Sequence, residues 1–330
     1  MSKVLVTGGA GFIGSHVVER LLALGRSVIC LDNFDPFYDP QIKRRNIDQA
    51  RQHPAFTLVE GDIRDQSLVR NLFARYEFDR VFHAAAKAGV RPSLQDPFVY
   101  EEVNVRGTLN LLSCAVENRT LPAGRQVKNF VFASSSSVYG ANSKVPFLEE
   151  DPVDRPISPY AATKKACELL CYTYHHLYRL PITCLRFFTV YGPRQRPEMA
   201  IHKFTHLILE GQPIPLYGEG NSRRDYTYID DAVDGVITAL DRDYPFEVIN
   251  IGEARTVSLI ELVTLLEERL GRKAAVKHLE LQPGDVLETW ADLAKARRLL
   301  DYVPRTDIRE GLQKFVEWYH KERTGRLCAS

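Results

Sequence analysis

A tyrosine and a lysine with the spacing YxxxK could act together on a substrate hydroxyl group. Tyr160 and Lys164 lie in a segment with helical periodicity, and positions i and i+4 share one face of a helix. A free tyrosine has a pKa of about 10, too high for a base at neutral pH, but a nearby cation stabilises the phenolate and lowers that pKa. We therefore predict that Tyr160 is a general base supported by Lys164. The alternative is an ordinary tyrosine and lysine on the protein surface.

A run of serines precedes this pair. Residues 134–137 are all serine, and they stand at the end of a predicted strand, Asn129–Ser134. Ligands bind at the carboxyl ends of the strands in parallel sheets of this kind. A serine hydroxyl at that edge could hold the reacting hydroxyl group within reach of Tyr160.

A glycine-rich loop lies near the N-terminus, between a predicted strand and a predicted helix. Gly8, Gly11 and Gly14 have the spacing GxxGxxG, which lets the backbone approach a pyrophosphate at the N-terminus of the helix. Asp32 ends the next predicted strand, where a carboxylate accepts hydrogen bonds from adenosine ribose hydroxyls and repels a 2′-phosphate. The pattern favours NAD over NADP as cofactor. The alternative is a helix-packing glycine cluster followed by a surface aspartate.

Alternating strands and helices must position these residues. In the first half we predict strands at Lys3–Thr7, Ser27–Asp32, Phe56–Glu60, Arg80–Ala85, Asn129–Ser134 and Thr183–Phe187, and helices at Ser15–Leu24, Ser67–Ala74, Val99–Glu117 and Tyr160–Tyr178. Strands with helices between them indicate a parallel sheet covered on both faces. The second half is more irregular, with strands predicted at Ile214–Tyr217, Arg224–Tyr228 and Val248–Ile251, and helices at Ala200–Leu209, Asp230–Leu240, Ser258–Leu270 and Ile308–His320.

Composition excludes several classes of protein. The chain has 43 Lys plus Arg and 42 Asp plus Glu, so its net charge of +1 argues against binding to nucleic acid. No stretch approaches the roughly 20 apolar residues needed to cross a bilayer, and the N-terminus does not resemble a signal peptide. The six cysteines show no CxxC spacing. We expect reduced core thiols, no metal site and a cytoplasmic protein.

These motifs together resemble the extended short-chain dehydrogenase/reductases, and among them the NAD-dependent nucleotide-sugar epimerases. The resemblance covers nearly the whole chain and includes TGGAGFIG at 7–14, HAAAKAG at 83–89, SSSSVYG at 134–140, RFFTVYGP at 186–193, RRDYTYIDD at 223–231 and QPGD at 282–285. It implies an α/β fold, with a Rossmann-type doubly wound parallel sheet and a smaller C-terminal α/β substrate domain. We expect the NAD-binding domain at 1–187, with 225–251 returning to it, and the nucleotide-sugar domain at 188–330.

The resemblance also implies roles for individual residues. The catalytic residues would be Ser135, Tyr160 and Lys164. The cofactor would be bound by Gly8, Gly11, Phe12, Ile13, Gly14, Asp32, Asn33, Asp62, Ile63, Lys87, Asn104, Tyr160, Lys164 and Phe188. The substrate would be bound by Arg91, Ser135, Ser136, Ser137, Tyr160, Thr189, Arg196, Arg224 and Asp285. Glucose epimerases often have Arg-Pro-Gly-Asp where this chain has Gln282-Pro283-Gly284-Asp285, which puts one diphosphate or uridine contact in doubt.

The residues after Ser135 bear on the type of reaction. Related 4,6-dehydratases carry a glutamate there, because dehydration needs an acid to expel a hydroxyl group. This chain has Ser136 and Ser137, which are not strong acids at neutral pH, so epimerisation is favoured. We predict C4 epimerisation of a UDP-sugar through a transient 4-keto intermediate. A redox-sensing binding protein of the same fold is the alternative from another class, and such proteins tend to lose the tyrosine or lysine.

Two segments bear on the sugar. Residues 186–199, with Arg196-Pro197-Glu198-Met199, and the segment around Arg91 resemble the UDP-glucuronate 4-epimerases, where an arginine meets the sugar carboxylate. A guanidinium offers parallel N–H donors to a carboxylate. The alternative is that both arginines are solvated loop cations and that the substrate is UDP-glucose. The resemblance further implies a homodimer formed through helices matching Val99–Glu117 and Tyr160–Tyr178.

Overall fold

A computed structural model describes residues 2–117, 126–280 and 286–329. The described residues form a seven-stranded parallel sheet in the order β10-β6-β5-β4-β1-β2-β3. Its strands are β1 (Lys3–Thr7), β2 (Ser27–Asp32), β3 (Phe56–Glu60), β4 (Arg80–His83), β5 (Asn129–Ser135), β6 (Ile182–Phe187) and β10 (Phe246–Ile251). The strand order reverses between β1 and β4, which is the place where doubly wound sheets bind nucleotides.

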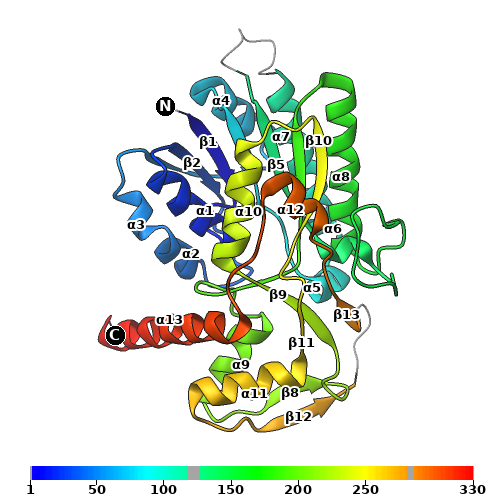
Figure 1. The fold of residues 1–330 in the computed structure, drawn as a ribbon. Coiled ribbons are helices and arrows are strands. Elements are labelled where there is room, and N and C mark those ends of the chain that lie inside the picture. Colours follow the sequence, from blue (N-terminus) through cyan, green and yellow to red (C-terminus); the bar gives the residue numbers. More distant parts are fainter. Residues whose placement is uncertain (1, 118–125, 281–285, 330) are drawn as a thin grey trace.

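Helices cover both faces of this sheet (Figure 1). Helices α1 (Phe12–Ala23) and α10 (Ile229–Asp241) pack together on one face, and α4 (Gln66–Tyr76), α7 (Gly107–Glu117) and α8 (Pro159–Tyr178) pack on the other. Alternate residues of β1 supply the two cores, since Val4 and Val6 belong to the cluster with α1 and Leu5 to the cluster with α7. Shorter helices are α2 (Pro40–Asn46), α3 (Asp48–Arg51), α5 (Val90–Gln95), α6 (Pro97–Tyr100), α12 (Ala294–Leu300) and a 3₁₀ helix (Ser136–Tyr139).

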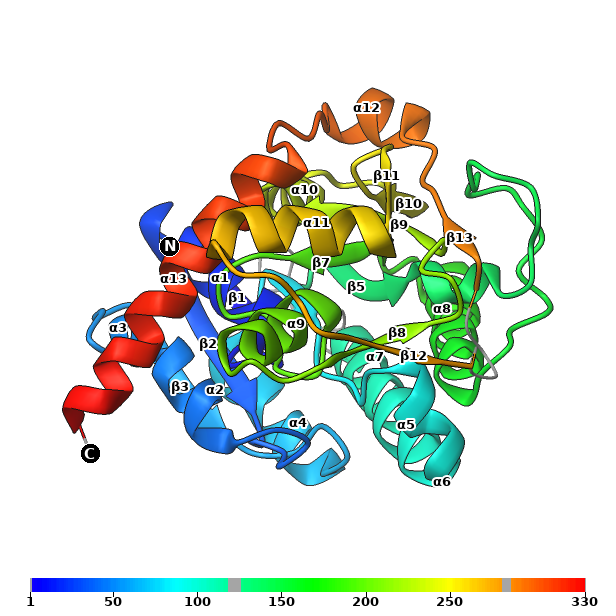
Figure 2. The same cartoon turned by 90° about the horizontal axis from the view of Figure 1, so that it is seen from below.

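Smaller sheets and helices lie beneath the carboxyl edge of the large sheet (Figures 1 and 2). Strand β9 (Arg223–Tyr228) pairs with β7 (Thr189–Tyr191), β11 (Thr256–Ser258) and β13 (Glu288–Thr289), and β8 (Ile214–Tyr217) pairs with β12 (Val276–Leu279). The helices of this part are α9 (Ala200–Leu209), α11 (Leu259–Leu270) and α13 (Ile308–Ala329). The Ser258 hydroxyl caps the start of α11 by accepting a hydrogen bond from the Glu261 N–H.

The predicted α/β fold with a Rossmann-type sheet and a smaller C-terminal part is confirmed. β10 lies beside β6 in the large sheet, while β9 belongs to the smaller one; the domain limits themselves stay a prediction. The helix predicted at Val99–Glu117 is wrong in detail, because a π-helix at Glu101–Arg106 separates α6 from α7. A π-turn accommodates an extra residue and leaves the apolar periodicity readable as one helix. None of the described helices is long and apolar enough to cross a membrane.

Candidate active site

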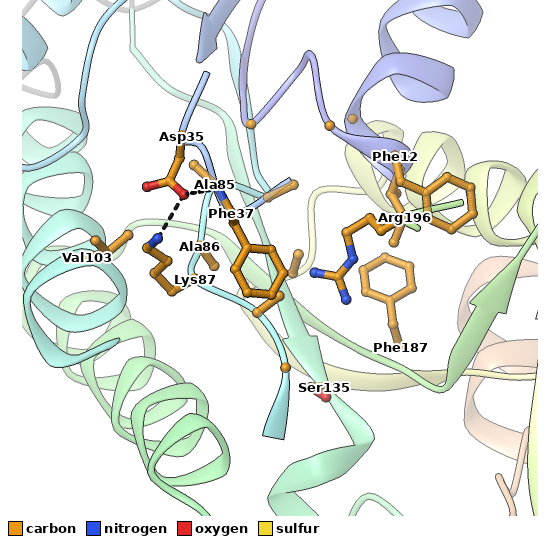
Figure 3. Close-up of a pocket in the computed structure, with 18 of the residues that line it drawn as sticks. Phe12, Asp35, Phe37, Ala85, Ala86, Lys87, Val103, Ser135, Phe187 and Arg196 are labelled. Carbon is orange, nitrogen blue, oxygen red and sulfur yellow. Dashed lines mark hydrogen bonds and ion pairs between the residues drawn. The ribbon is translucent and has the colours of Figure 1, made fainter. Parts of the chain in front are cut away.

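A cavity of about 380 Å³ opens where β1, β2, β4, β5 and β6 end, and Figure 3 shows part of its lining. Most of the residues predicted for the site line it: Gly8, Gly11, Phe12, Ile13, Gly14, Asp32, Asn33, Asp62, Ile63, Lys87, Ser135, Ser136, Ser137, Tyr160, Lys164, Phe188, Thr189 and Arg196. They come from distant parts of the chain. The fold therefore gathers the glycine loop, the tyrosine and the arginine into one site.

The glycine loop between β1 and α1 packs its backbone too closely for side chains at Gly8 and Gly14. Gly8 has a φ of +68°, in the left-handed region that favours glycine. A Cβ at Gly14 would lie 2.1 Å from the Gly8 carbonyl oxygen. Gly11 precedes α1 and no side chain caps this helix, so its first N–H groups are open to an anion. These features fit a pyrophosphate.

Asp32, at the end of β2, is hydrogen-bonded to the glycine loop. Its carboxylate is buried, with Oδ2 accepting from the Ala10 N–H at 3.0 Å and Oδ1 from the Phe34 N–H at 2.9 Å. Oδ2 keeps a lone pair for a ribose hydroxyl. The Lys43 ammonium lies 3.5 Å from Oδ1.

Asn33 and Asp62, two of the predicted cofactor-binding residues, meet in the lining of the cavity. The Asn33 amide donates to Asp62 Oδ2 at 2.9 Å, and Arg64 donates to both Asp62 oxygens. Partial burial alone would raise the pKa of Asp62, but the hydrogen bonds from Arg64 and Asn33 outweigh it and lower that pKa. Ile63 is buried beside Gly107, where a Cβ would lie 2.4 Å from its side chain.

The start of α8 presents Tyr160 and Lys164 to the cavity. The Ser158 hydroxyl caps the helix by accepting from the Ala161 N–H, and Pro159 occupies the first turn. The Lys164 ammonium is buried and donates to the Ala133 carbonyl at 2.7 Å, which leaves two N–H donors for a ligand. Lys164 is thus fixed against the end of β5.

Two hydroxyl side chains near Tyr160 are also held in place. The Tyr160 ring packs edge-on against Tyr100, with centroids 6.2 Å apart, and the Tyr100 hydroxyl donates to the Ala88 carbonyl at 2.8 Å. Ser135 Oγ accepts from the Ser137 N–H at 3.2 Å and donates to Ser137 Oγ at 3.1 Å. The predicted catalytic residues therefore lie on rigid elements.

Asn104 holds the backbone of Lys87, which lines the cavity. It lies in the π-helix, its Oδ1 accepts from the Lys87 N–H at 2.8 Å, and its Nδ2 donates to the Lys87 carbonyl and to Thr163 Oγ1. It is not among the lining residues. The Lys87 ammonium is 2.7 Å from Asp35 Oδ1, and Figure 3 shows this pair beside Phe37.

Arg196 enters the cavity on a loop that follows β7. His16 on α1 contacts the Pro193 carbonyl at 3.0 Å, and Arg194 pairs with Glu19 of the same helix at 2.6 Å. Burial, together with the positive charge of Arg194, lowers the pKa of His16 to about 4, so this ring is neutral at pH 7. The loop is therefore fastened to the helix that bears the glycine loop.

The guanidinium of Arg196 lies near the Phe37 ring. Its carbon is 5.9 Å from the ring centre, and Figure 3 shows the two side chains together in the lining. Its Nε is 3.1 Å from the Glu198 carboxylate, and the Arg196 side chain is 22% exposed.

Two of the predicted substrate residues that the structure describes are not in the lining. Arg91 stacks on Tyr217, with its guanidinium carbon 4.1 Å from the ring centre, and Arg224 donates to the Arg223 carbonyl at 2.9 Å. Asp285 lies outside the described residues. Their predicted roles stay predictions.

Sequence reasoning missed several lining residues in one segment after β2 and on the helix that follows. Asp35, Phe37, Tyr38 and Lys43 all line the cavity, as does Met199. The sequence Asp-Pro-Phe-Tyr at 35–38 directly follows the carboxyl end of a predicted strand. Because that edge holds ligands, its position was the available signal.

Comparison with known proteins places the chain in a family. Residues 5–315 match the family model described as GDP-mannose 4,6 dehydratase. The chain belongs to this family of extended short-chain dehydrogenase/reductases, within its nucleotide-sugar epimerases.

Its relatives have named activities. The chain is 43% identical to UDP-glucuronate 4-epimerase of Thermodesulfobacterium geofontis over 96% of both chains. It is 45% identical to UDP-glucuronate 4-epimerase 1 of Arabidopsis thaliana, over 96% of this chain and 76% of that one. The structure of UDP-glucuronic acid 4-epimerase from Bacillus cereus with UDP-glucuronic acid and NAD matches with a TM-score of 0.89 and 37% identity, over 97% of this chain and 99% of that chain.

Proposed function

We propose that this chain interconverts UDP-glucuronate and UDP-galacturonate by epimerisation at C4, through a transient 4-keto sugar, with bound NAD. The observation that carries the proposal is the Arg196 guanidinium inside the cavity, on a loop fastened to α1. A uronic acid brings a carboxylate into a site with little water, and such a charge needs a paired cation. The names of the relatives support the same substrate.

The cavity fits NAD along its length. The open N-terminus of α1 suits the pyrophosphate, the close packing of Gly14 on the Gly8 backbone shapes the loop beside it, and Asp32 offers oxygens to the adenosine ribose. Lys164 keeps two N–H donors near the opposite end. NAD, when bound, supplies the hydride acceptor and donor for C4.

The side chains then handle the proton. Tyr160 removes the proton of the C4 hydroxyl group when C4 is oxidised and returns it when the keto group is reduced on the other face. Lys164 stabilises the phenolate by its charge, and Ser135 holds the C4 oxygen by a hydrogen bond. The buried ends of β5 and α8 keep these three groups in fixed relative positions.

Arg196 gives the site its preference for an acid. It now pairs with Glu198, whose side chain is 39% exposed. A substrate carboxylate could exchange with Glu198 and take two parallel N–H bonds from the guanidinium. Thr189, at the start of β7, also lines the cavity.

UDP-glucose 4-epimerase is the second candidate. The contact between Arg196 and Glu198 favours it, because an arginine that already has a carboxylate partner does not require a second one. The structure of a Thermotoga maritima UDP-glucose 4-epimerase with UDP-glucose also matches, at 34% identity and a TM-score of 0.87.

Turnover of both sugars by the same preparation tests the proposal. We expect kcat/KM for UDP-glucuronate to exceed that for UDP-glucose. The reverse order would replace the proposal by its alternative.

We also propose a cytoplasmic homodimer. The five cysteines whose side chains are described are free and buried, which suits a reducing compartment.

The proposed dimer would use an apolar surface on two neighbouring helices, α7 and α8. Its exposed side chains are Leu109 of α7 and Leu169, Tyr172 and Leu177 of α8, and such a surface suits a second copy of the chain.

A further inference from the structure

A buried ion pair lies just outside the cavity. Arg186 of β6 and Glu168 of α8 are each 2% exposed. Arg186 Nε lies 2.9 Å from Glu168 Oε1, and Nη2 lies 2.9 Å from Oε2, so the two groups form a bidentate fork. Neither residue is among those that line the cavity.

The pair connects β6 with the two elements that carry the proposed catalytic residues, β5 and α8. Glu168 lies on α8, two turns beyond Tyr160. The Ser134 hydroxyl, next to Ser135 in β5, donates to Glu168 Oε1 at 2.7 Å. Arg186 lies opposite Ser134 in the sheet and three residues before Thr189. The Arg186–Glu168 fork and the Ser134 hydrogen bond therefore connect α8, β5 and the end of β6 that leads to Thr189.

The pair is charged throughout the working range of pH. Burial alone would raise the pKa of Glu168, but the hydrogen bonds and charge of Arg186, with the Ser134 hydroxyl, hold it below its usual value. Burial alone would lower the pKa of Arg186, but the hydrogen bonds and charge of Glu168 outweigh burial and hold that pKa above its usual value. Removing Glu168 would take this carboxylate away from the buried Arg186 charge, and removing Arg186 would leave Glu168 with the Lys165 ammonium at 3.3 Å.

Other charged and titratable groups surround the pair and Tyr160. Those near the pair are Lys165 on α8, Tyr139 on the 3₁₀ helix and Glu149 on the next loop. Tyr160 faces Tyr100 of α6 and shares its cavity with Lys164, Asp32, Asp35, Lys43, Asp62, Lys87 and Arg196. None of these contacts makes a second fork between β6 and α8 among the described residues.

We propose that Arg186 and Glu168 are positioning residues for the C4 proton transfer. They act through Ser134 and α8, keeping Tyr160 aligned with Ser135 and the sugar, and touch neither ligand. The proposal rests on the proposed role of Tyr160 as the base. A lysine at position 186 would keep the charge but lose the planar fork that fixes the angle between helix and strand.

The charges also give a signature that a merely structural role lacks. Glu168 is eight residues along α8 from Tyr160, about 12 Å at 1.5 Å per residue. At an effective dielectric constant of 20, a change of one charge at that distance shifts the pH of half-maximal kcat by up to about one unit. The shift has opposite signs when Arg186 is removed and when Glu168 is removed.

The experiment measures kcat and KM against pH, with the UDP-sugar that the wild type turns over, for Arg186→Met, Glu168→Gln and the double variant. We expect kcat to fall by about ten- to a hundredfold, with KM within about threefold. The pH of half-maximal kcat should rise for Arg186→Met, fall for Glu168→Gln and return in the double variant. Arg26→Met is the matched control, because it removes a bidentate arginine from a surface pair with Asp241 and should leave kcat unchanged.

Two milder variants keep the test decisive if the first ones do not fold. Arg186→Lys retains the charge, so it should lower kcat without moving the pH profile, and Ser134→Ala removes only the link to β5 and should also lower kcat. Wild-type kcat in both variants would overturn the proposal, as would equal shifts of the pH profile for both charges. Tyr160→Phe in the same assay separates the two hypotheses: an active Tyr160→Phe enzyme refutes the proposed base itself, whereas an inactive one beside normal Arg186 variants refutes only the positioning role.

Discussion

Replacing Arg196 by methionine should discriminate between an acidic and a neutral sugar. Methionine keeps much of the side chain's volume and contact with Phe37 while removing the guanidinium. The side chain is 22% exposed and already has Glu198 at 3.1 Å, so binding a substrate carboxylate exchanges one carboxylate for another. A partly exposed pair of this kind is worth about 0–1 kcal/mol, whereas a hydrogen bond to a charged group in the closed site is worth about 1.5–3 kcal/mol.

Two such bonds total about 3–6 kcal/mol, and the exchanged Glu198 pair offsets up to about 1 kcal/mol, so kcat/KM for UDP-glucuronate should fall by at least about thirtyfold. UDP-glucose offers only a hydroxyl group at that position, so its kcat/KM should fall by less than about tenfold. Steady-state kinetics of both sugars on the same variant measure the ratio. Arg194→Met is the control: it loosens the loop from Glu19 without removing the proposed carboxylate contact, and should affect the two sugars alike. Equal losses on both sugars in Arg196→Met would refute the carboxylate role.

Four further outcomes follow from the site and the surface. Tyr160→Phe, folded and with NAD bound, should lose about 10²–10⁴-fold in kcat; turnover within threefold of wild type, by coupled assay, would contradict the assignment. Asp32→Ser should narrow the preference for NAD over NADP by about tenfold or more, measured by calorimetric titration, because the Lys43 ammonium then faces the 2′-phosphate without a competing carboxylate. Light scattering at micromolar concentration should give about twice 37.5 kDa, and Leu169→Glu should reduce it toward 37.5 kDa; a monomeric wild type would exclude the dimer. The pKa of His16 is lowered to about 4, so between pH 4 and about 6.5 the unfolded chain binds a proton that the folded chain does not, and the free energy of unfolding should rise with pH over this range. Urea titrations should show a shallower rise for His16→Gln. An unchanged slope would argue against this linkage.

The sequence was most informative where local chemistry and backbone geometry coincide. Gly8, Gly14 and Asp32 could be predicted because a turn, a helix start and a strand end each need a particular residue type. Tyr160 and Lys164 could be predicted because their spacing places both on one helix face, and the structure brings both to the cavity.

Contacts between distant segments could not be read in this way. Asn104 turns toward Lys87 because a π-helix replaces one turn of the helix expected there, and periodicity carries no signal for that change. The fork between Glu168 and Arg186 depends on how α8 crosses β6. Arg91 was expected at the sugar but lies on Tyr217, a ring whose position depends on the smaller sheet.

Identification of the product formed from pure UDP-glucuronate tests the proposed reaction most directly. Proton NMR of the mixture, with the enzyme and NAD, distinguishes the two sugars by the coupling of the C4 hydrogen. We expect UDP-galacturonate to accumulate to an equilibrium that is also reached from pure UDP-galacturonate. Absence of UDP-galacturonate, together with conversion of UDP-glucose to UDP-galactose by the same preparation, would contradict the proposed substrate.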